Sequence, residues 1–131
     1  MAQSSSMSQT ARSTPLHVAV AFVAMGGWAA FANSAHGPRA MLPAFLVQGA
    51  LSAVLMLLLK RGLEALYARL PGPAARIAPP LISCTLIAGV LSAVHALAGT
   101  PELLRTVALP WTASTLYAFV YTATLPAKEP R

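Results

Sequence analysis

Charged residues are scarce in this sequence. Nine basic and three acidic residues make up only 9% of its 131 positions, whereas an ordinary soluble domain has about 25%. Hydrophobic residues account for 56% of the chain. Twelve charged side chains cannot cover the surface of a water-soluble domain of this length, so most apolar residues must face lipid. The composition therefore excludes an ordinary soluble fold and predicts a membrane protein with one domain.

Cysteine and membrane-embedded carboxylates are also nearly absent. The only cysteine, Cys84, lies inside an apolar run, so one chain forms neither a disulfide framework nor a thiolate metal site. No Asp, Glu, Lys or Arg lies near the middle of an apolar run. Cation-coupled carriers and exporters of cationic drugs usually need a carboxylate there. The sequence argues against both classes.

The excess of positive charge does not predict a nucleic-acid partner. The formal net charge is +6, but the basic residues form no stripe interleaved with aromatic or amide side chains. They lie between the apolar runs, which is typical of membrane topology signals and of attraction to anionic lipid.

Four apolar runs are present, at residues 16–32, 40–59, 79–98 and 106–125. About 20 helical residues span the roughly 30 Å hydrocarbon core of a bilayer. The runs are continuously apolar and rich in Ala and Leu, without the alternation of a barrel strand, and backbone groups in lipid must bond internally. We predict an all-α bundle of four transmembrane helices over residues 15–127, after a disordered, Ser-rich tail at residues 1–14.

The distribution of Lys and Arg predicts the orientation. Seven of the nine lie before the first run, between the second and third, or after the fourth, and only Arg39 and Arg105 lie in the other connections. The positive-inside rule then places both termini in the cytoplasm. An alternative is that Ala30-Phe31-Ala32 marks a signal-peptidase site, and cleavage there would leave three spans.

After Lys60 and Arg61, helical spacing continues beyond the second run. The apolar residues share one helical face, and Lys60 and Glu64 lie four residues apart. This pattern predicts a short amphipathic extension on the inner leaflet. Its apolar face consists of Leu63, Leu66, Tyr67 and Leu70.

Mild polar residues recur at helical spacing within three of the runs and predict a polar face of the bundle. One reading is that they join the helices through close contacts and hydrogen bonds. The other is that they line a polar groove. These residues are Gln48, Ser52, Ser92, Ser114 and Tyr117.

The two outer connections contain the densest polar chemistry. Arg39 and Arg105 run against the positive-inside trend, and anion binding by forked guanidinium donors is one explanation. Alternatively, Glu102 pairs with one Arg and the other extends to headgroups. The predicted substrate-binding residues at this rim are Arg39, Arg105, His36, His95, Asn33 and Glu102. His36 and His95 lack an obvious third metal ligand beyond Glu102, and we expect neither metal nor cofactor.

No nucleophile with a base, no paired carboxylates and no metal set is visible, so an enzyme is the least favoured class. Two hypotheses remain. The first is a bacterial inner-membrane protein that transports or flips an anionic lipid or lipid-linked intermediate. The second is a non-catalytic accessory subunit of a larger membrane complex. Expected partners are membrane lipids and either a second copy or a larger membrane protein, because four short helices enclose little volume alone.

Overall fold

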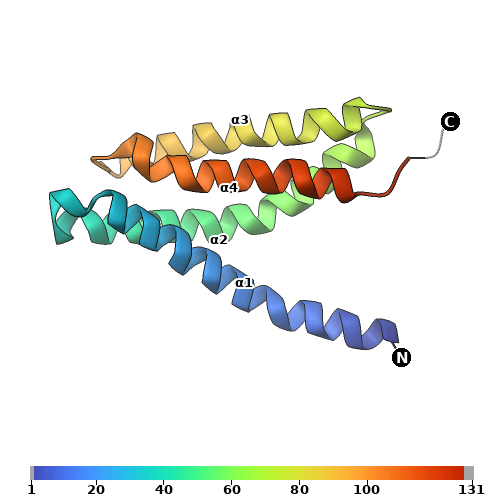
Figure 1. Cartoon of the computed structure of the whole chain (residues 1–131), viewed down its shortest axis with the longest axis horizontal. Coiled ribbons are helices and arrows are strands. Elements are labelled where there is room, and N and C mark those ends of the chain that lie inside the picture. The colour runs from blue at the N-terminus through green and yellow to red at the C-terminus, as the bar shows by residue number, and fades with distance from the viewer. Residues whose placement is uncertain (1, 129–131) are drawn as a thin grey trace.

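The computed structural model describes the backbone of residues 2–128 and the side chains of residues 15–128. Within this part the chain is helical and contains no strand (Figure 1). The elements are α1 (Ala2–Ala32), the short 3-10 helix η1 (Ser34–His36), α2 (Pro38–Arg69), α3 (Ala74–Leu97) and α4 (Leu103–Thr124). The all-α prediction is confirmed. The predicted disordered tail lies outside the residues whose side chains are described and stays a prediction.

Three of the described helical segments are long and apolar enough to cross a membrane, which indicates a membrane protein. They are Pro15–Ala32, Pro38–Arg69 and Ala74–Leu97. Helix α4 has 22 residues, enough to cross a bilayer by length. Its threonine, serine and tyrosine side chains make α4 less apolar than these three segments. Helix α4 therefore does not meet the same criterion for a membrane span.

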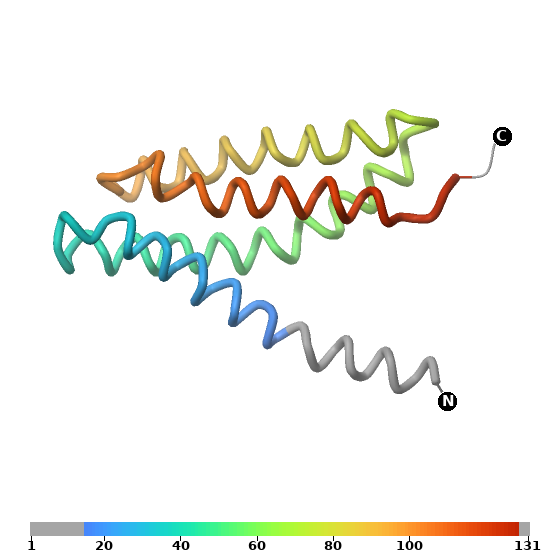
Figure 2. Tube along the Cα trace, in the orientation of Figure 1, coloured from blue at the N-terminus to red at the C-terminus, as the bar shows by residue number. Residues whose placement is uncertain are grey.

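Helices α2, α3 and α4 lie side by side, and successive helices run in opposite directions (Figure 1). Helix α1 packs mainly against α2 and diverges from the other helices towards Pro15 (Figure 2). From Pro15 on, its buried positions are confined to its second half, at Gly26, Ala29 and Ala32. The turns of α1 between Pro15 and Met25 are thus loosely packed.

Two glycines allow α1 and α2 to approach closely. A Cβ atom at Gly26 would lie 2.7 Å from the backbone oxygen of Phe45, and one at Gly49 would lie 2.7 Å from the ring of Phe22. The rings of Phe22 and Phe45 meet edge to face, with centroids 5.7 Å apart. Each glycine therefore receives an aromatic residue of the opposite helix, as small residues do in membrane bundles.

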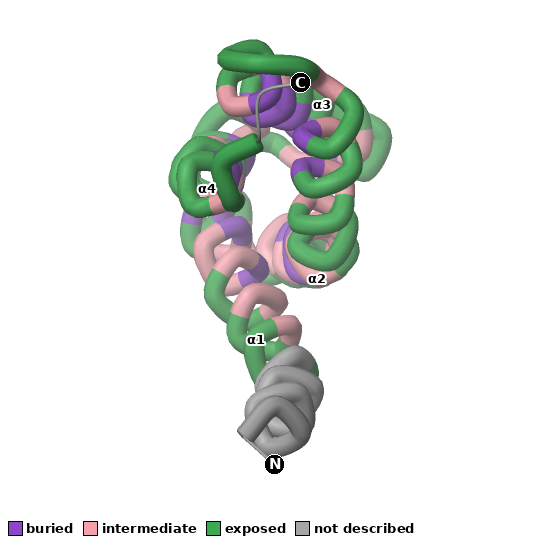
Figure 3. Tube along the Cα trace, turned by 90° about the vertical axis from the view of Figure 1, so that its right-hand side faces the viewer, coloured by how far each residue is buried: buried purple, intermediate pink, exposed green. Residues whose placement is uncertain are grey.

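A small apolar core joins α2, α3 and α4. Ile87, Leu91 and Val107 form its centre, and leucines of α2 pack around them. Figure 3, viewed from the end where α2 meets α3, shows buried positions turned inward and exposed positions outward. The outward positions include large apolar residues such as Leu86 and Val120, each 63% exposed. An apolar surface of this kind suits contact with lipid chains.

Helix α2 continues without a break to Arg69, and its last turns pack inward. Leu63 is fully buried and Tyr67 is 9% exposed, so the predicted amphipathic extension is helical but packs against the bundle instead of lying on headgroups. The Tyr67 hydroxyl donates to the carbonyl of Pro126, just beyond the end of α4. The prediction failed because spacing identifies an apolar face but not the surface that covers it.

Arg76, near the start of α3, caps the C-terminal end of α4. Its guanidinium donates to the carbonyls of Thr122, Ala123 and Leu125 at 3.0, 3.1 and 3.1 Å and lies over the Tyr67 ring, 5.5 Å from the centroid. The last carbonyls of a helix lack intrahelical partners, and a cation there also complements the helix dipole. Arg76 therefore fixes where α4 ends.

Candidate functional site

A cavity of about 1070 Å³ lies among α1, α2 and α4, in the region where α1 diverges (Figure 2). Ligand pockets usually measure about 300–1,000 Å³, so the space is large enough for a sizeable molecule. Its α1 wall consists of one helical face, His17, Ala21 and Met25. The cavity therefore lies beside a part of α1 that has no buried position between Pro15 and Met25.

The two ends of the cavity differ chemically. Lys60, Arg61 and Glu64 line the end nearer the α2–α3 turn, and Gln48 and Ser52 line the end nearer η1. The wall between them is largely apolar and includes Leu55, Leu59 and Leu91. An amphipathic molecule with an anionic end would match this distribution, because opposite charges would meet at Lys60 and Arg61 while apolar chains meet the leucines.

Glu64 has a neutral partner at the charged end. The hydroxyl of Tyr121 donates to its carboxylate across the α2–α4 contact, and the Tyr121 ring stacks on that of Tyr117 with centroids 5.4 Å apart. Lys60 and Arg61 are exposed, and neither forms an ion pair within residues 15–128. Positive charge therefore remains available at this end of the cavity.

A buried chain of polar groups ends at the opposite side of the cavity. His95 and Gln48 are both fully buried. His95 Nε2 lies 2.8 Å from Gln48 Oε1, and the Gln48 amide donates to Ser52 Oγ at 2.9 Å. On its other side His95 Nδ1 lies 2.8 Å from Thr100 Oγ1. The chain runs from the α3–α4 connection through α3 to the cavity wall on α2.

The groups in this chain determine the tautomer of His95. Gln48 Oε1 can only accept a hydrogen bond, so Nε2 of a neutral His95 carries the proton and Nδ1 accepts from Thr100. Every contact in the chain is then satisfied with an uncharged imidazole. The donors of the chain all point towards Ser52.

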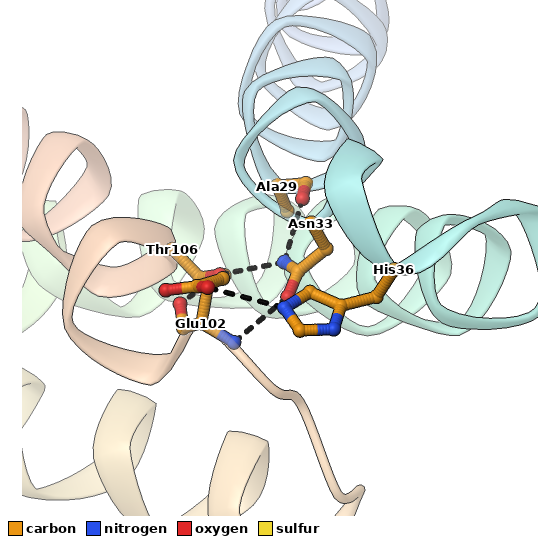
Figure 4. A network of polar contacts seen from close by, with 5 residues as sticks. All are labelled: Ala29, Asn33, His36, Glu102 and Thr106. Carbon is orange, nitrogen blue, oxygen red and sulfur yellow. Dashed lines mark hydrogen bonds and ion pairs between the residues drawn. The ribbon is translucent and has the colours of Figure 1, made fainter.

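At the η1 end of the bundle, Asn33 links α1 to α4 (Figure 4). Its amide donates to the Ala29 carbonyl at 2.8 Å and to Thr106 Oγ1 at 2.7 Å, and its Oδ1 accepts from the Glu102 backbone N–H at 3.0 Å. Thr106 in turn donates to the Glu102 carbonyl. Asn33 is fully buried, and both amide hydrogens are used within the protein.

Glu102 pairs with His36, and not with an arginine. Its Oε1 lies 3.1 Å from His36 Nε2, with both side chains more than a third exposed (Figure 4). Arg39 and Arg105 are exposed and form no ion pair in the described part of the chain. The backbone carbonyl of Arg105 accepts from the Trp28 indole at 2.9 Å.

The predicted rim residues thus separate into three groups. Asn33, His36 and Glu102 are in contact with one another, and His95 belongs to the buried chain. The side chains of the two arginines form no hydrogen bond or ion pair with residues 15–128. Among the side chains at residues 15–128, no cluster of three potential metal ligands occurs.

Most of the predicted polar face reaches the cavity. Gln48, Ser52, Ser114 and Tyr117 line it, whereas the half-buried Ser92 does not. Sequence reasoning missed the contribution of His17, whose spacing with Ala21 and Met25 was a detectable signal. It also missed Thr100, because no spacing rule connects a loop hydroxyl to an imidazole.

Comparison with known protein families, with curated proteins and with solved structures finds no match to this chain. The fold and the long apolar helices define it as a helical membrane protein.

Proposed function

We propose that this chain is a small multi-pass protein of the bacterial inner membrane that binds and moves an anionic lipid or lipid-linked intermediate. One observation carries the proposal. The cavity combines an apolar wall with a cationic end at Lys60 and Arg61, which complements a molecule with apolar chains and an anionic headgroup. Membrane lipids are the most abundant molecules of this chemistry around such a protein.

The proposal includes four spans, with both termini in the cytoplasm. The alternating helix directions and the 22 residues of α4 support the fourth span. In the orientation favoured by the basic residues, Lys60 and Arg61 lie towards the inner leaflet, where anionic lipids attract them.

Movement of an anionic lipid between leaflets requires a binding position for its headgroup at each membrane surface. Arg39 and Arg105 are exposed at the η1 end, which is the outer side in this orientation. An arginine there can bind a phosphate through paired donors. The proposed path therefore begins and ends at cations, with the cavity along α1 between them.

The first test measures lipid selectivity. Replacing both Lys60 and Arg61 by Gln should remove the preference for phosphatidylglycerol over phosphatidylethanolamine in native mass spectrometry, because the cationic end of the cavity is lost. Arg69→Gln is the matched control, since Arg69 is exposed on the same helix but does not line the cavity. Equal preference in the double variant and the wild type would refute the cavity site.

Reconstitution in vesicles then tests movement. The wild type should accelerate the transfer of a fluorescent phosphatidylglycerol between leaflets, and Arg39→Gln or Arg105→Gln should slow it. Selective binding without accelerated transfer would exclude transport and favour an accessory subunit, or a homodimer, that carries bound lipid.

A further inference from the structure

Ser52 differs from the other bonded Ser and Thr hydroxyls within the helices, which donate to a backbone carbonyl one turn earlier in their own helix. Thr85, Thr106, Thr112, Ser114 and Thr122 each donate to the carbonyl four residues earlier. This is the usual way in which a helical hydroxyl is satisfied without a partner outside the helix. Ser52 Oγ instead accepts from Gln48, and its own hydrogen has no acceptor within residues 15–128.

The buried chain explains why Ser52 is left as a donor. Thr100 donates to His95, His95 donates to Gln48 and Gln48 donates to Ser52, so each group passes a hydrogen in the same direction. Ser52 is the last member and lines the cavity. The end of the chain therefore presents the hydroxyl hydrogen of Ser52 to whatever occupies the cavity.

The distance to the charged end restricts the occupant. Eight residues separate Ser52 from Lys60, which corresponds to roughly 12 Å along the helix. Long Lys and Arg side chains shorten the gap that the ligand has to bridge. The ligand must have an anionic group, an uncharged acceptor a few bonds deeper, and apolar chains beyond it.

We infer that the cavity is selective for a diacyl anionic glycerophospholipid, whose ester carbonyl accepts from Ser52 while its phosphate lies at Lys60 and Arg61. The inference rests on the proposed function and names the lipid class. A polyprenyl phosphate has the anion and the apolar chain but no carbonyl below the phosphate. His95 acts here as a positioning residue, because it touches Gln48 and not the lipid.

The test compares two lipids that differ only at the acceptor. Diacyl phosphatidylglycerol and its dialkyl ether analogue carry the same headgroup and charge, but the ether has no carbonyl. In competitive native mass spectrometry, the wild type should prefer the diacyl lipid about two- to tenfold, the range expected for one net hydrogen bond. Ser52→Ala should bind both lipids equally, at the affinity that the wild type has for the ether.

Ser114→Ala is the matched control. Ser114 also lines the cavity, but its hydroxyl is committed to the Pro110 carbonyl at 2.7 Å. This variant should keep the diacyl preference. Unchanged affinity of Ser52→Ala for the ether lipid shows that the bundle is intact. If Ser52→Ala binds neither lipid, Ser52→Cys decides, because a thiol has a similar size but is a weak donor, and it should reduce the preference.

Each outcome has one meaning. Equal binding of the two lipids by the wild type overturns the ester inference. A diacyl preference that persists in Ser52→Ala, or that is undiminished in Ser52→Cys, overturns it as well. Neither result affects the proposed function as long as phosphatidylglycerol is preferred over phosphatidylethanolamine. Loss of that headgroup preference in the wild type would overturn the proposed function itself.

Discussion

Gln48, His95 and Asn33 are polar side chains that the bundle buries completely. Asn33 joins α1 to α4, and the contact between His95 and Gln48 joins α3 to α2, so each side chain has a hydrogen-bond partner on another helix. A buried polar group without a partner costs about 1–3 kcal/mol. These residues therefore specify which helices face each other, because any other arrangement leaves them unpaired.

The substitution His95→Leu tests whether the buried polar side chains stabilise the bundle. The substitution leaves Gln48 Oε1 and Thr100 Oγ1 without their shared partner, so the free energy of unfolding in detergent should fall by about 1–2 kcal/mol. Ser92→Ala, on the same helix and without a side-chain hydrogen bond to any residue from 15 to 128, should change this free energy by less than about 0.5 kcal/mol. Equal stability of the two variants would show that the buried chain contributes nothing to folding.

At the scale of the element, the α1–α2 contact depends on close backbone approach. Gly26→Ala would place a methyl group 2.7 Å from the Phe45 carbonyl oxygen. Because backbone atoms cannot move away as a side chain does, we expect a loss of about 1–3 kcal/mol in stability, measured by denaturant unfolding in mixed micelles.

The neighbouring glycine supplies the control. A Cβ at Gly27 meets nothing within 4 Å, so Gly27→Ala should be neutral or should stabilise the helix by up to about 1 kcal/mol. Equal stability of the Gly26→Ala and Gly27→Ala variants would show that α1 and α2 are not in close backbone contact at Gly26.

The helices themselves could be predicted from the apolar runs, but their ends could not. The third run begins at residue 79, yet α3 begins at Ala74, because helical hydrogen bonding does not require apolar side chains. The polar faces of α2 and α4 followed from spacing. The pairing of His36 with Glu102, and of Asn33 with Thr106, did not. Such contacts depend on how the helices pack, which a single sequence does not state.

For the whole molecule, topology remains the central prediction. A reporter fused after Arg131 should be active in the cytoplasm, because an even number of spans returns the chain to the side of its basic N-terminal region. A fusion within the α3–α4 connection, at Gly99, should report the opposite side. Periplasmic activity of the C-terminal fusion would contradict the four-span arrangement.

The position of the buried residues of α1 has a mechanical consequence. The helix is held at Gly26, Ala29 and Ala32 and by the Trp28 bond to Arg105, while Pro15 lies eleven residues away from Gly26, roughly 16 Å along the axis. The part of α1 before Gly26 can therefore tilt about the glycine contact with α2. A tilt of about 10° at Gly26 moves the Pro15 end by roughly 3 Å. A molecule that enters the cavity between α1 and α4 should therefore be accommodated by a tilt of α1.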